Sequence, residues 1–360
     1  FYCPKLFAAA SIPVRRKKDW PRECLLVTFG LERQVISPRI AVAVEPYPNR
    51  WTHHVVVSQP EEIDGKLLDW LETSGHKDQR LPALSYIQYR ADRPPWQGAQ
   101  PSVIPTLRGP HMQIIISPAK KMVEDRDSLA PRSVPQFLPQ TKQLLKVLRA
   151  MSPQELQRLW GCNDAIARLN VQRLETMELE GDLTPAILSY QGIQYQYMAP
   201  GVLESQALDY LQAHLRILSG FYGVLRPFDG VTPYRLEMQA KLAVEGAKNL
   251  YEFWGDRLAQ TLAEEDGWVL NLASKEYSRA VAPHLPQETE LVTCRFGIWK
   301  NSKLAERGTQ CKMARGEMVR WLAQNQITRR EDLPAFQGLG YRFDSSASTR
   351  TELIFYTEGE

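Results

Sequence analysis

The segment 218–239 (LSGFYGVLRPFDGVTPYRLEMQ) constrains the fold of this chain more than any other stretch. It has too little periodicity for an amphipathic helix and too many glycines and prolines for a plain strand. Its glycines permit backbone conformations that other residues avoid, and its prolines fix the backbone. These residues are Gly220, Gly223, Gly230, Pro227 and Pro233. The segment is therefore predicted to form a rigid loop.

Two arginines on this loop, Arg226 and Arg235, would be presented at low entropic cost, as an anion site requires. The alternative is a buried structural loop, in which Arg226 pairs with Asp229 and Arg235 pairs with Glu237. The sequence leaves both interpretations open.

Composition indicates a soluble globular protein with a sizeable core, because 43% of the 360 residues are hydrophobic and 24% are charged. No stretch approaches the roughly 18 apolar residues of a membrane span, and the first residues of the sequence do not show the charged-then-apolar pattern of a signal peptide. The five cysteines form no C-x-x-C pair. They predict a reducing, cytoplasmic setting without disulfides. Only two histidines follow Met112 and no carboxylate–histidine spacing recurs, so we expect no iron-storage site, although a site of clustered carboxylates stays open as an alternative. We expect no metal and no cofactor.

Charge is distributed unevenly along the chain. Residues 1–111 carry 15 Lys and Arg against 11 Asp and Glu, whereas the remainder carries 29 against 30. The larger part is therefore not basic as a whole. Any nucleic-acid surface on it must come from local clustering.

The chain is expected to divide near Met112, which precedes the apolar strand Gln113–Ile116 as a start codon would. Residues 81–111 contain six prolines and predict a linker. We expect three parts: a partial small α+β domain over 1–80, a Pro-rich linker over 81–111, and a main domain over 112–360. The upstream part is then a separate module fused to a complete protein.

The upstream part shows strand patterns at 25–29 and 52–57 and an amphipathic helix pattern at 63–71, with a start signal at 58–61. Its block Pro48–His54 resembles a small bacterial domain of unknown function, the DUF5655 type, over about 80 residues. The basic run Arg15–Lys18 is either a nucleic-acid patch or a solvated turn. Adjacent residues of a strand face opposite sides, so His53 and His54 cannot chelate one metal together.

Several ordered motifs follow Met112. They are SPAK at 117–120, the loop 218–239, LYEFWG at 250–255, NLASKEY at 271–277 and KMARG at 312–316. This set resembles the YaaA family of peroxide-stress proteins from Met112 to about Phe355. The resemblance implies a cytoplasmic protein that limits oxidative damage to DNA and protein by lowering unincorporated iron. It also implies a DNA-binding α/β fold with a positively charged cleft and a helix-hairpin-helix element.

Residues 152–173 are the candidate for this element. Ser152–Glu155 forms a capping box, residues 160–163 form a turn around Gly161, and Asn163 can cap a second helix. Such hairpins hold a phosphate at the N-terminus of the second helix, and Arg168 and Arg173 could add contacts. Only one glycine is present in the turn, so an ordinary pair of helices is an equal alternative.

The remaining motifs predict an anion-binding cleft. Lys120 follows a strand end, where α/β folds commonly bind ligands, and Lys275 and Glu276 follow the strand at 268–270. We expect six basic residues to converge on one anionic ligand: Lys120, Arg226, Arg235, Lys275, Lys312 and Arg315. Gly316 should allow a second backbone to approach closely. Cys311, beside Lys312, is either an oxidisable thiol or an inert buried residue.

Two functions remain open. The first is a non-catalytic stress protein that binds the DNA phosphate backbone and has no membrane association. The second is an enzyme acting on a nucleotide or nucleic acid in the same cleft, with Lys275 and Glu276 as its candidate catalytic residues. No Walker loop, dinucleotide fingerprint or nucleophile motif is present. The first function is therefore favoured, and the oligomeric state is not determined.

Overall fold

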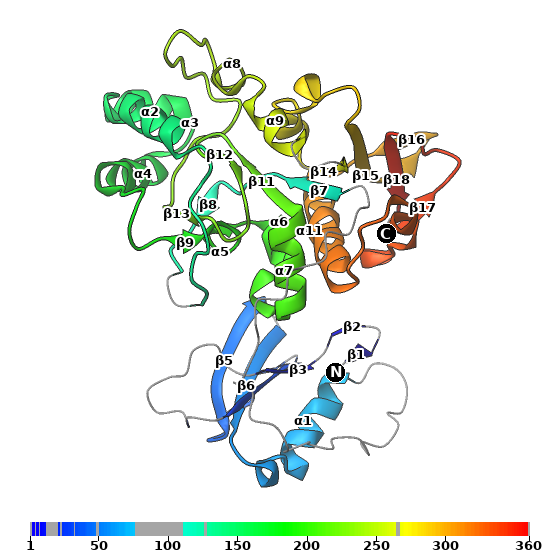
Figure 1. The fold of residues 1–360 in the computed structure, drawn as a ribbon. Helices are drawn as coiled ribbons and strands as arrows, with labels where there is room; N and C mark the ends of the chain where they lie inside the picture. The colour runs from blue at the N-terminus through cyan, green and yellow to red at the C-terminus, as the bar shows by residue number, and fades with distance from the viewer. Residues whose placement is uncertain are drawn as a thin grey trace, which may run out of the picture. The chain divides into compact units, whose positions relative to one another are not determined.

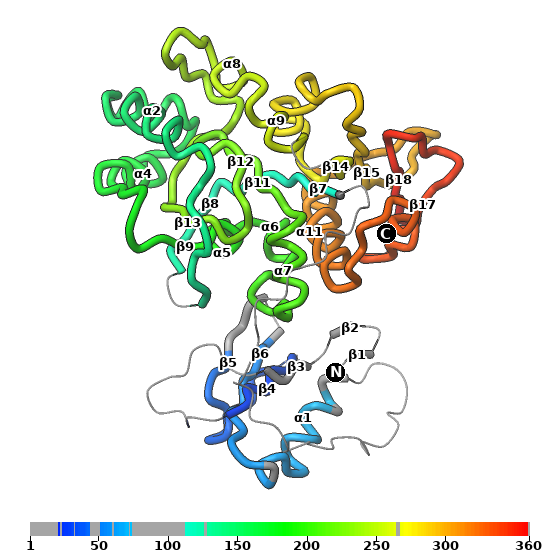
Figure 2. The backbone as a smooth tube through the Cα atoms, in the orientation of Figure 1, coloured from blue at the N-terminus to red at the C-terminus, as the bar shows by residue number. Residues whose placement is uncertain are grey.

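The computed structural model describes residues 2–3, 5–6, 8–11, 21, 24–31, 33–47, 50–75, 111–125, 128–263 and 267–358. The chain divides into two compact units, residues 1–106 and 107–360 (Figures 1 and 2). The basic run Arg15–Lys18 and residues 81–110 of the expected linker lie outside the described residues.

The first unit contains a four-stranded antiparallel sheet in the order β3-β4-β6-β5, packed on helix α1 (Gly65–Gly75). The bounds of the strands are Ala8–Ser11, Leu25–Leu31, Ile40–Tyr47 and Arg50–Val57 for β3 to β6. Both strands predicted in this part are confirmed, as β4 and β6. A short antiparallel pair, β1 (Tyr2–Cys3) and β2 (Lys5–Leu6), precedes the sheet.

Helix α1 begins later than the start signal indicates. Residues Pro60–Glu62 form a separate 3-10 turn, η1, whose Glu62 accepts the backbone N–H of Ser58. The side chain of Asp64 accepts the N–H of Leu67 at 2.9 Å and so caps the helix. The expected alternation at the two histidines is confirmed. His53 is buried and stacks on Phe29, whereas His54 is half-buried on the other face.

The second unit is built on an eight-stranded sheet in the order β12-β11-β7-β14-β15-β18-β17, with β16 paired to β15. Strands β11, β7, β14, β15 and β18 run parallel, and β12, β16 and β17 are antiparallel to their neighbours. The strand bounds are β7 His111–Ile116, β11 Leu215–Ser219, β12 Gly223–Leu225, β14 Gly267–Leu272, β15 Glu290–Lys300, β16 Lys303–Ala305, β17 Arg342–Asp344 and β18 Glu352–Tyr356. The mixed α/β class expected for this part is confirmed.

Helices cover both faces of this sheet. In Figure 1, α9 lies on one side and α6, α7 and α11 lie on the other. A strand that is buried on both faces has a continuous run of apolar residues, and this explains why Ile114–Ile116 of β7 are all isoleucine. The helix bounds are α2 Leu138–Arg149, α3 Pro153–Trp160, α4 Asp164–Thr176, α5 Ala186–Ser189, α6 Ile193–Met198, α7 Ser205–His214, α8 Leu250–Trp254, α9 Arg257–Ala263, α10 Lys275–Ser278 and α11 Gly308–Gln324. Two small antiparallel pairs complete the unit: β8 (Lys121–Met122) with β10 (Tyr190–Gln191), and β9 (Thr184–Pro185) with β13 (Gly230–Val231).

The close backbone approach expected at Gly316 is confirmed. Gly316 lies on α11 where the backbone of α6 passes, and a Cβ there would stand 2.1 Å from the carbonyl oxygen of Gln194. Only glycine allows the two helices to pack at this separation. No described helix combines the length and the apolar character that a transmembrane segment needs.

The helices expected over 152–173 are present as α3 and α4. Ser152 and Glu155 cap each other's backbone at the start of α3, as the capping box predicts. Gly161 ends α3 in the left-handed region with a φ of 53°, and Asn163 accepts the N–H of Ile166 to begin α4. The local sequence therefore specifies both the turn and the two helix boundaries.

Candidate functional site

The site lies where the direction of chain connections reverses in the sheet. From β7 the chain continues to its neighbour β11 on one side, and from β14 it continues to β15 on the other. Because β7 and β14 are themselves parallel neighbours, their carboxyl ends form a topological switch point. Ligands of open α/β sheets bind at such points.

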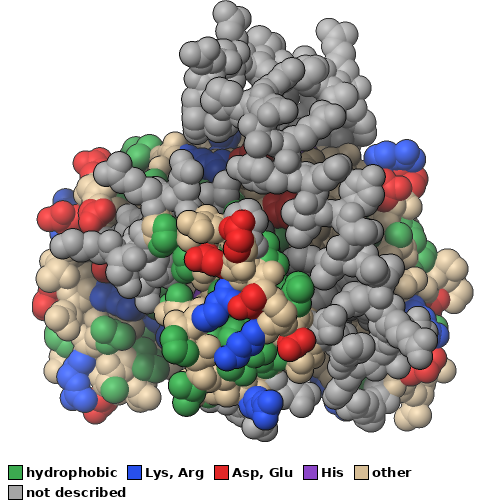
Figure 3. Space-filling model, turned by 90° about the horizontal axis from the view of Figure 1, so that it is seen from below, with side chains coloured by type: hydrophobic (Ala, Val, Ile, Leu, Met, Phe, Trp, Pro, Cys, Tyr) green, Lys and Arg blue, Asp and Glu red, His purple; other side chains and the backbone are tan. Residues whose placement is uncertain are grey.

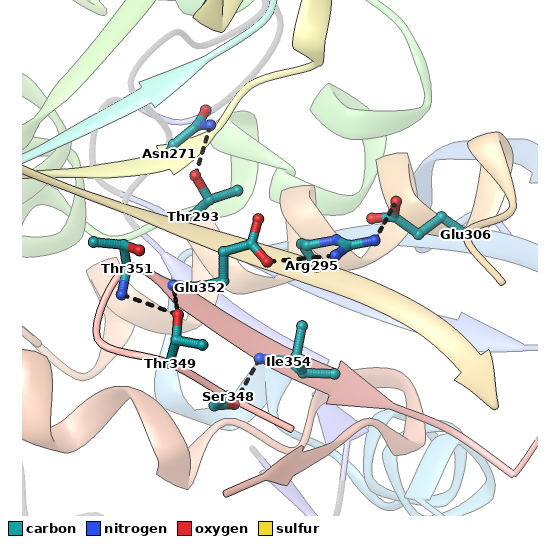
Figure 4. A network of polar contacts seen from close by, with 9 residues as sticks. All are labelled: Asn271, Thr293, Arg295, Glu306, Ser348, Thr349, Thr351, Glu352 and Ile354. Carbon is teal, nitrogen blue, oxygen red and sulfur yellow. Dashed lines mark hydrogen bonds and ion pairs between the residues drawn. The ribbon is translucent and has the colours of Figure 1, made fainter. Parts of the chain in front are cut away.

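The loops that follow the two strands are tied together. The hydroxyl of Ser117, after β7, accepts the backbone N–H of Ser274, after β14, at 2.8 Å. Tyr195 of α6 donates a hydrogen bond to the carbonyl of Ser117. The buried Asn271 fixes the end of β14. Its amide donates to Thr293 (Figure 4), and its side-chain oxygen accepts the N–H of Ala273.

A third segment, residues 234–239 of the glycine-rich loop, crosses the same point. Gly220 makes this possible, because a Cβ there would lie 2.7 Å from the carbonyl oxygen of Leu236 and 3.0 Å from the backbone of Glu237. The backbone N–H of Gln239 donates to the carboxylate of Glu276 at 3.3 Å. The loop carrying Arg235 and Glu237 is therefore held against the end of β11 and against α10, the helix that follows β14.

Four charged side chains meet at this place. One carboxylate oxygen of Glu237 lies 2.9 Å from the guanidinium of Arg235 and 3.2 Å from the ammonium of Lys120. The side chains of Arg235 and Glu237 are each only 11% exposed, whereas that of Lys120 is 65% exposed. Glu276 interacts electrostatically with both Glu237 and Lys120. We call Lys120, Arg235, Glu237 and Glu276 the switch-point cluster.

Burial raises the pKa of the Glu276 carboxyl above its ordinary value, and the neighbouring Glu237 adds to the rise. The N–H of Gln239 and the charge of Lys120 act in the opposite direction. A half-buried carboxyl beside a second carboxylate can exchange a proton nearer neutral pH than an exposed one. Lys275, the preceding residue, is exposed at the start of α10.

The aromatic residues near the cluster belong to the core. Tyr222, Tyr234, Trp254 and Tyr277 are all buried, in keeping with a packing role rather than with stacking platforms. The Tyr234 hydroxyl bonds to Ser219 at 2.6 Å and to Tyr190 at 2.9 Å. Burial raises the pKa of Tyr234 to about 12, so this network is neutral at physiological pH.

Arg226 lies exposed in the turn between β12 and β13. Asp229 in that turn accepts the backbone N–H of Arg226 at 2.8 Å and the hydroxyl of Ser133 at 2.6 Å. Asp229 therefore holds the backbone of Arg226, while the side chain of Arg226 lies on the exposed surface.

Lys312 and Arg315 both lie on α11 but differ in environment. Lys312 is exposed, whereas the Nε of Arg315 is buried without a hydrogen-bond partner. Burial lowers the pKa of the Arg315 guanidinium, and the neighbouring Cys311 and Glu306 act against that shift. Cys311 is buried, donates to the carbonyl of Phe296 and has a pKa raised by burial. This buried environment agrees with an inert cysteine rather than with an oxidisable thiol, the two alternatives that the sequence left open.

The two arginines of α4 also differ. Arg168 is exposed, whereas Arg173 is half-buried and donates to the carbonyl of Met122 at 3.1 Å. Arg173 therefore ties α4 to β8.

In the face seen in Figure 3, the described basic side chains stand among acidic ones. The described residues contain no group of three or more His, Cys, Asp or Glu side chains that could hold a metal ion.

Known proteins match the part of the chain that carries this site. The sequence model described as "Peroxide stress protein YaaA" matches residues 112–347, the range that contains the whole switch-point cluster. The chain belongs to the YaaA peroxide stress protein family. A second model, "Domain of unknown function (DUF5655)", matches residues 1–74.

Curated relatives of the YaaA part are named "UPF0246 protein". One from Lachnoclostridium phytofermentans is 52% identical over 244 residues, which cover 68% of this chain and 96% of the relative. One from Lactiplantibacillus plantarum is 50% identical, with 68% and 98% covered. One from Agathobacter rectalis is 49% identical, with 68% and 98% covered.

Sequence reasoning about this YaaA-family chain underrated one residue. Glu237 was expected as a partner of Arg235, and it also pairs with Lys120, which lies more than one hundred positions earlier. The signal that could have revealed this was Gly220, since a glycine at a strand end often marks a close backbone approach. The hydrogen bonds between Ser117 and Ser274 had no signal in the sequence.

Proposed function

We propose that the chain is a cytoplasmic peroxide-stress protein that binds the phosphate backbone of DNA and limits iron-dependent oxidative damage. Membership of the YaaA family supports the link to peroxide stress. The α3–α4 hairpin is the single observation that carries the DNA-binding part of the proposal.

The N-terminus of α4 supports a phosphate contact. The first backbone N–H groups of a helix lack intrahelical acceptors, and Asn163 satisfies that of Ile166. The preceding N–H groups and the helix dipole favour an anion there. Asp164 opposes an anion at this end, and its carboxylate accepts a hydrogen bond from Gln157 at 2.7 Å. The exposed Arg168, one turn further along, supplies a positive charge.

Substitution of Arg168 tests the hairpin directly. The Arg168→Gln variant should bind duplex DNA more weakly, and the log–log slope against salt should become shallower by about 0.9 if one phosphate contact is lost. The matched control is Arg342→Gln, because Arg342 is exposed and pairs with an exposed carboxylate on Glu358. Equal affinity and equal slope for wild type and Arg168→Gln would contradict a phosphate contact at the hairpin.

A second candidate function is an enzyme that acts on a nucleotide or nucleic acid. One observation favours an enzyme: Glu276, whose pKa is raised, interacts with both Lys120 and Glu237. Neutralising the charge of a phosphate requires only basic side chains, so the two carboxylates are consistent with a catalytic role. Cells carrying Glu276→Gln separate the two functions. Retained peroxide survival supports DNA binding without catalysis. Lost survival, with the variant folded and bound to DNA, supports the enzyme.

A further inference from the structure

The switch-point cluster is distinct from the α3–α4 hairpin and offers a binding site of its own. It occupies the carboxyl ends of β7 and β14, where three loops converge and are held by hydrogen bonds between Ser117 and Ser274 and between Gln239 and Glu276. Side chains on such tied loops are pre-organised, so little entropy is lost when a ligand binds.

The charges of the cluster select the sign of the ligand. Lys120 and Arg235 carry two positive charges against two carboxylates, Glu237 and Glu276, and the exposed Lys275 precedes Glu276 in the sequence. The cluster itself is neutral with both carboxylates ionised, and it becomes positive when Glu276, whose pKa is raised by burial, takes up a proton. An anion is therefore the favoured ligand.

The environment of Arg235 indicates that the anionic ligand is an oxyanion. Its Nη2 contacts Glu237, while its Nε is buried without a hydrogen-bond partner. A buried donor without an acceptor is costly, and guanidinium donors match the oxygens of phosphate. The mostly exposed ammonium of Lys120 can bind the same group from the solvent side.

The carboxylates indicate what else the ligand carries. Glu237 and Glu276 accept hydrogen bonds, which the dianionic phosphate group of a monoester cannot donate because it carries no proton. Hydroxyl groups of a sugar can donate them, and carboxylates at switch points of α/β sheets commonly accept from ribose. Phosphate and hydroxyl groups must then belong to one small molecule that spans the cluster.

We propose that the switch-point cluster binds a small phosphate monoester of a polyol, with the phosphate on Lys120 and Arg235 and hydroxyl groups on Glu237 and Glu276. A nucleoside monophosphate and a sugar phosphate share this chemistry. This site does not depend on DNA binding by the hairpin.

Calorimetric titration of the full chain without DNA tests the proposal with three probes: adenosine 5′-monophosphate, ribose 5-phosphate and inorganic phosphate. Saturable binding of an ester, tighter than that of inorganic phosphate, is the expected result. A preference for the nucleotide identifies a nucleoside ligand, and equal binding of both esters identifies a sugar phosphate. No binding of either ester, or binding no tighter than that of inorganic phosphate, overturns the proposal.

Two adjacent lysines provide matched variants for the same titration. Lys120→Gln removes a cation of the cluster and should weaken ester binding about tenfold or more, the effect of losing one charged hydrogen bond. Lys121→Gln, which changes an exposed neighbour on β8, should leave binding unchanged. Equal effects of the two substitutions would place the ligand elsewhere. Both side chains are exposed, so both variants are expected to fold.

Discussion

Lys120 and Glu237 are joined by an ion pair of 3.2 Å across the carboxyl ends of two parallel strands. Lys120 is near the start of the YaaA part and Glu237 is near its middle. The pair forms because Gly220, which follows β11, lets the loop that carries Glu237 lie against the end of that strand. A backbone feature without a side chain therefore assembles the charged cluster.

Replacing Glu237 should weaken the fold and strengthen anion binding. Glu237→Gln leaves the nearly buried Arg235 without its counter-charge, so we expect a loss of about 1–3 kcal/mol in the free energy of unfolding. Removal of a negative charge should also raise affinity for inorganic phosphate, which has no sugar hydroxyl groups to place on Glu237. Denaturant unfolding measures the first effect. Glu358→Gln, at an exposed ion pair, is the control and should change stability by less than about 0.5 kcal/mol.

Adding one methyl group at Gly316 should be strongly destabilising. Gly316→Ala places a Cβ 2.1 Å from a backbone oxygen of α6, so the two helices must separate. Overpacking of this kind costs about 1–3 kcal/mol or more, measurable by thermal unfolding. Gly308→Ala is the matched control on the same helix, because a Cβ there meets nothing within 4 Å. Similar unfolding temperatures for the two variants would contradict the packing described.

Glu276 predicts a specific pH dependence of stability. Its pKa is raised in the folded state, so the folded protein holds this proton more tightly than the unfolded chain does. Stability is then lost as pH rises from the unfolded pKa to the folded one. The loss is about 1.4 kcal/mol for each pH unit that separates the two pKa values. Glu276→Gln removes this loss.

Unfolding of Glu276→Gln and wild type should therefore be compared from about pH 4 to pH 7. The variant should gain stability relative to wild type as pH rises and then hold a constant advantage. A difference that does not change with pH would show that the carboxyl titrates normally.

The turn between α3 and α4 should tolerate asparagine but not valine. Gly161 has a φ of 53°, a conformation that β-branched residues rarely adopt, although a Cβ there meets nothing within 4 Å. Gly161→Val should cost about 1–2 kcal/mol and weaken DNA binding through the hairpin. Gly161→Asn should retain both, since asparagine tolerates this region. Unimpaired DNA binding by a folded Gly161→Val variant would remove the hairpin from the DNA-binding surface.

The sequence predicted features that depend on local chemistry. The strand at Gln113–Ile116, the capping box at Ser152, the cap at Asn163 and the close approach at Gly316 all follow from residue types and spacing. Each of these depends on neighbours along the chain, or on the lack of a side chain.

Convergence of charged residues was harder to predict. Of the six basic residues expected to converge, Lys120 and Arg235 do come together, whereas the Nε of Arg315 is buried on α11. Arg173, expected at the hairpin, holds α4 on β8. Which basic side chain faces solvent depends on how distant elements pack. A single sequence does not encode that packing in any local pattern.

The salt dependence of duplex DNA binding tests the central claim most directly. If the chain binds the phosphates of the DNA backbone, the logarithm of the binding constant should fall linearly with the logarithm of salt concentration, with a slope of about −0.9 for each phosphate contacted. Fluorescence anisotropy of a labelled duplex measures this between low and physiological salt. A steep fall is the predicted result, and an affinity that stays flat across this range would contradict the claim.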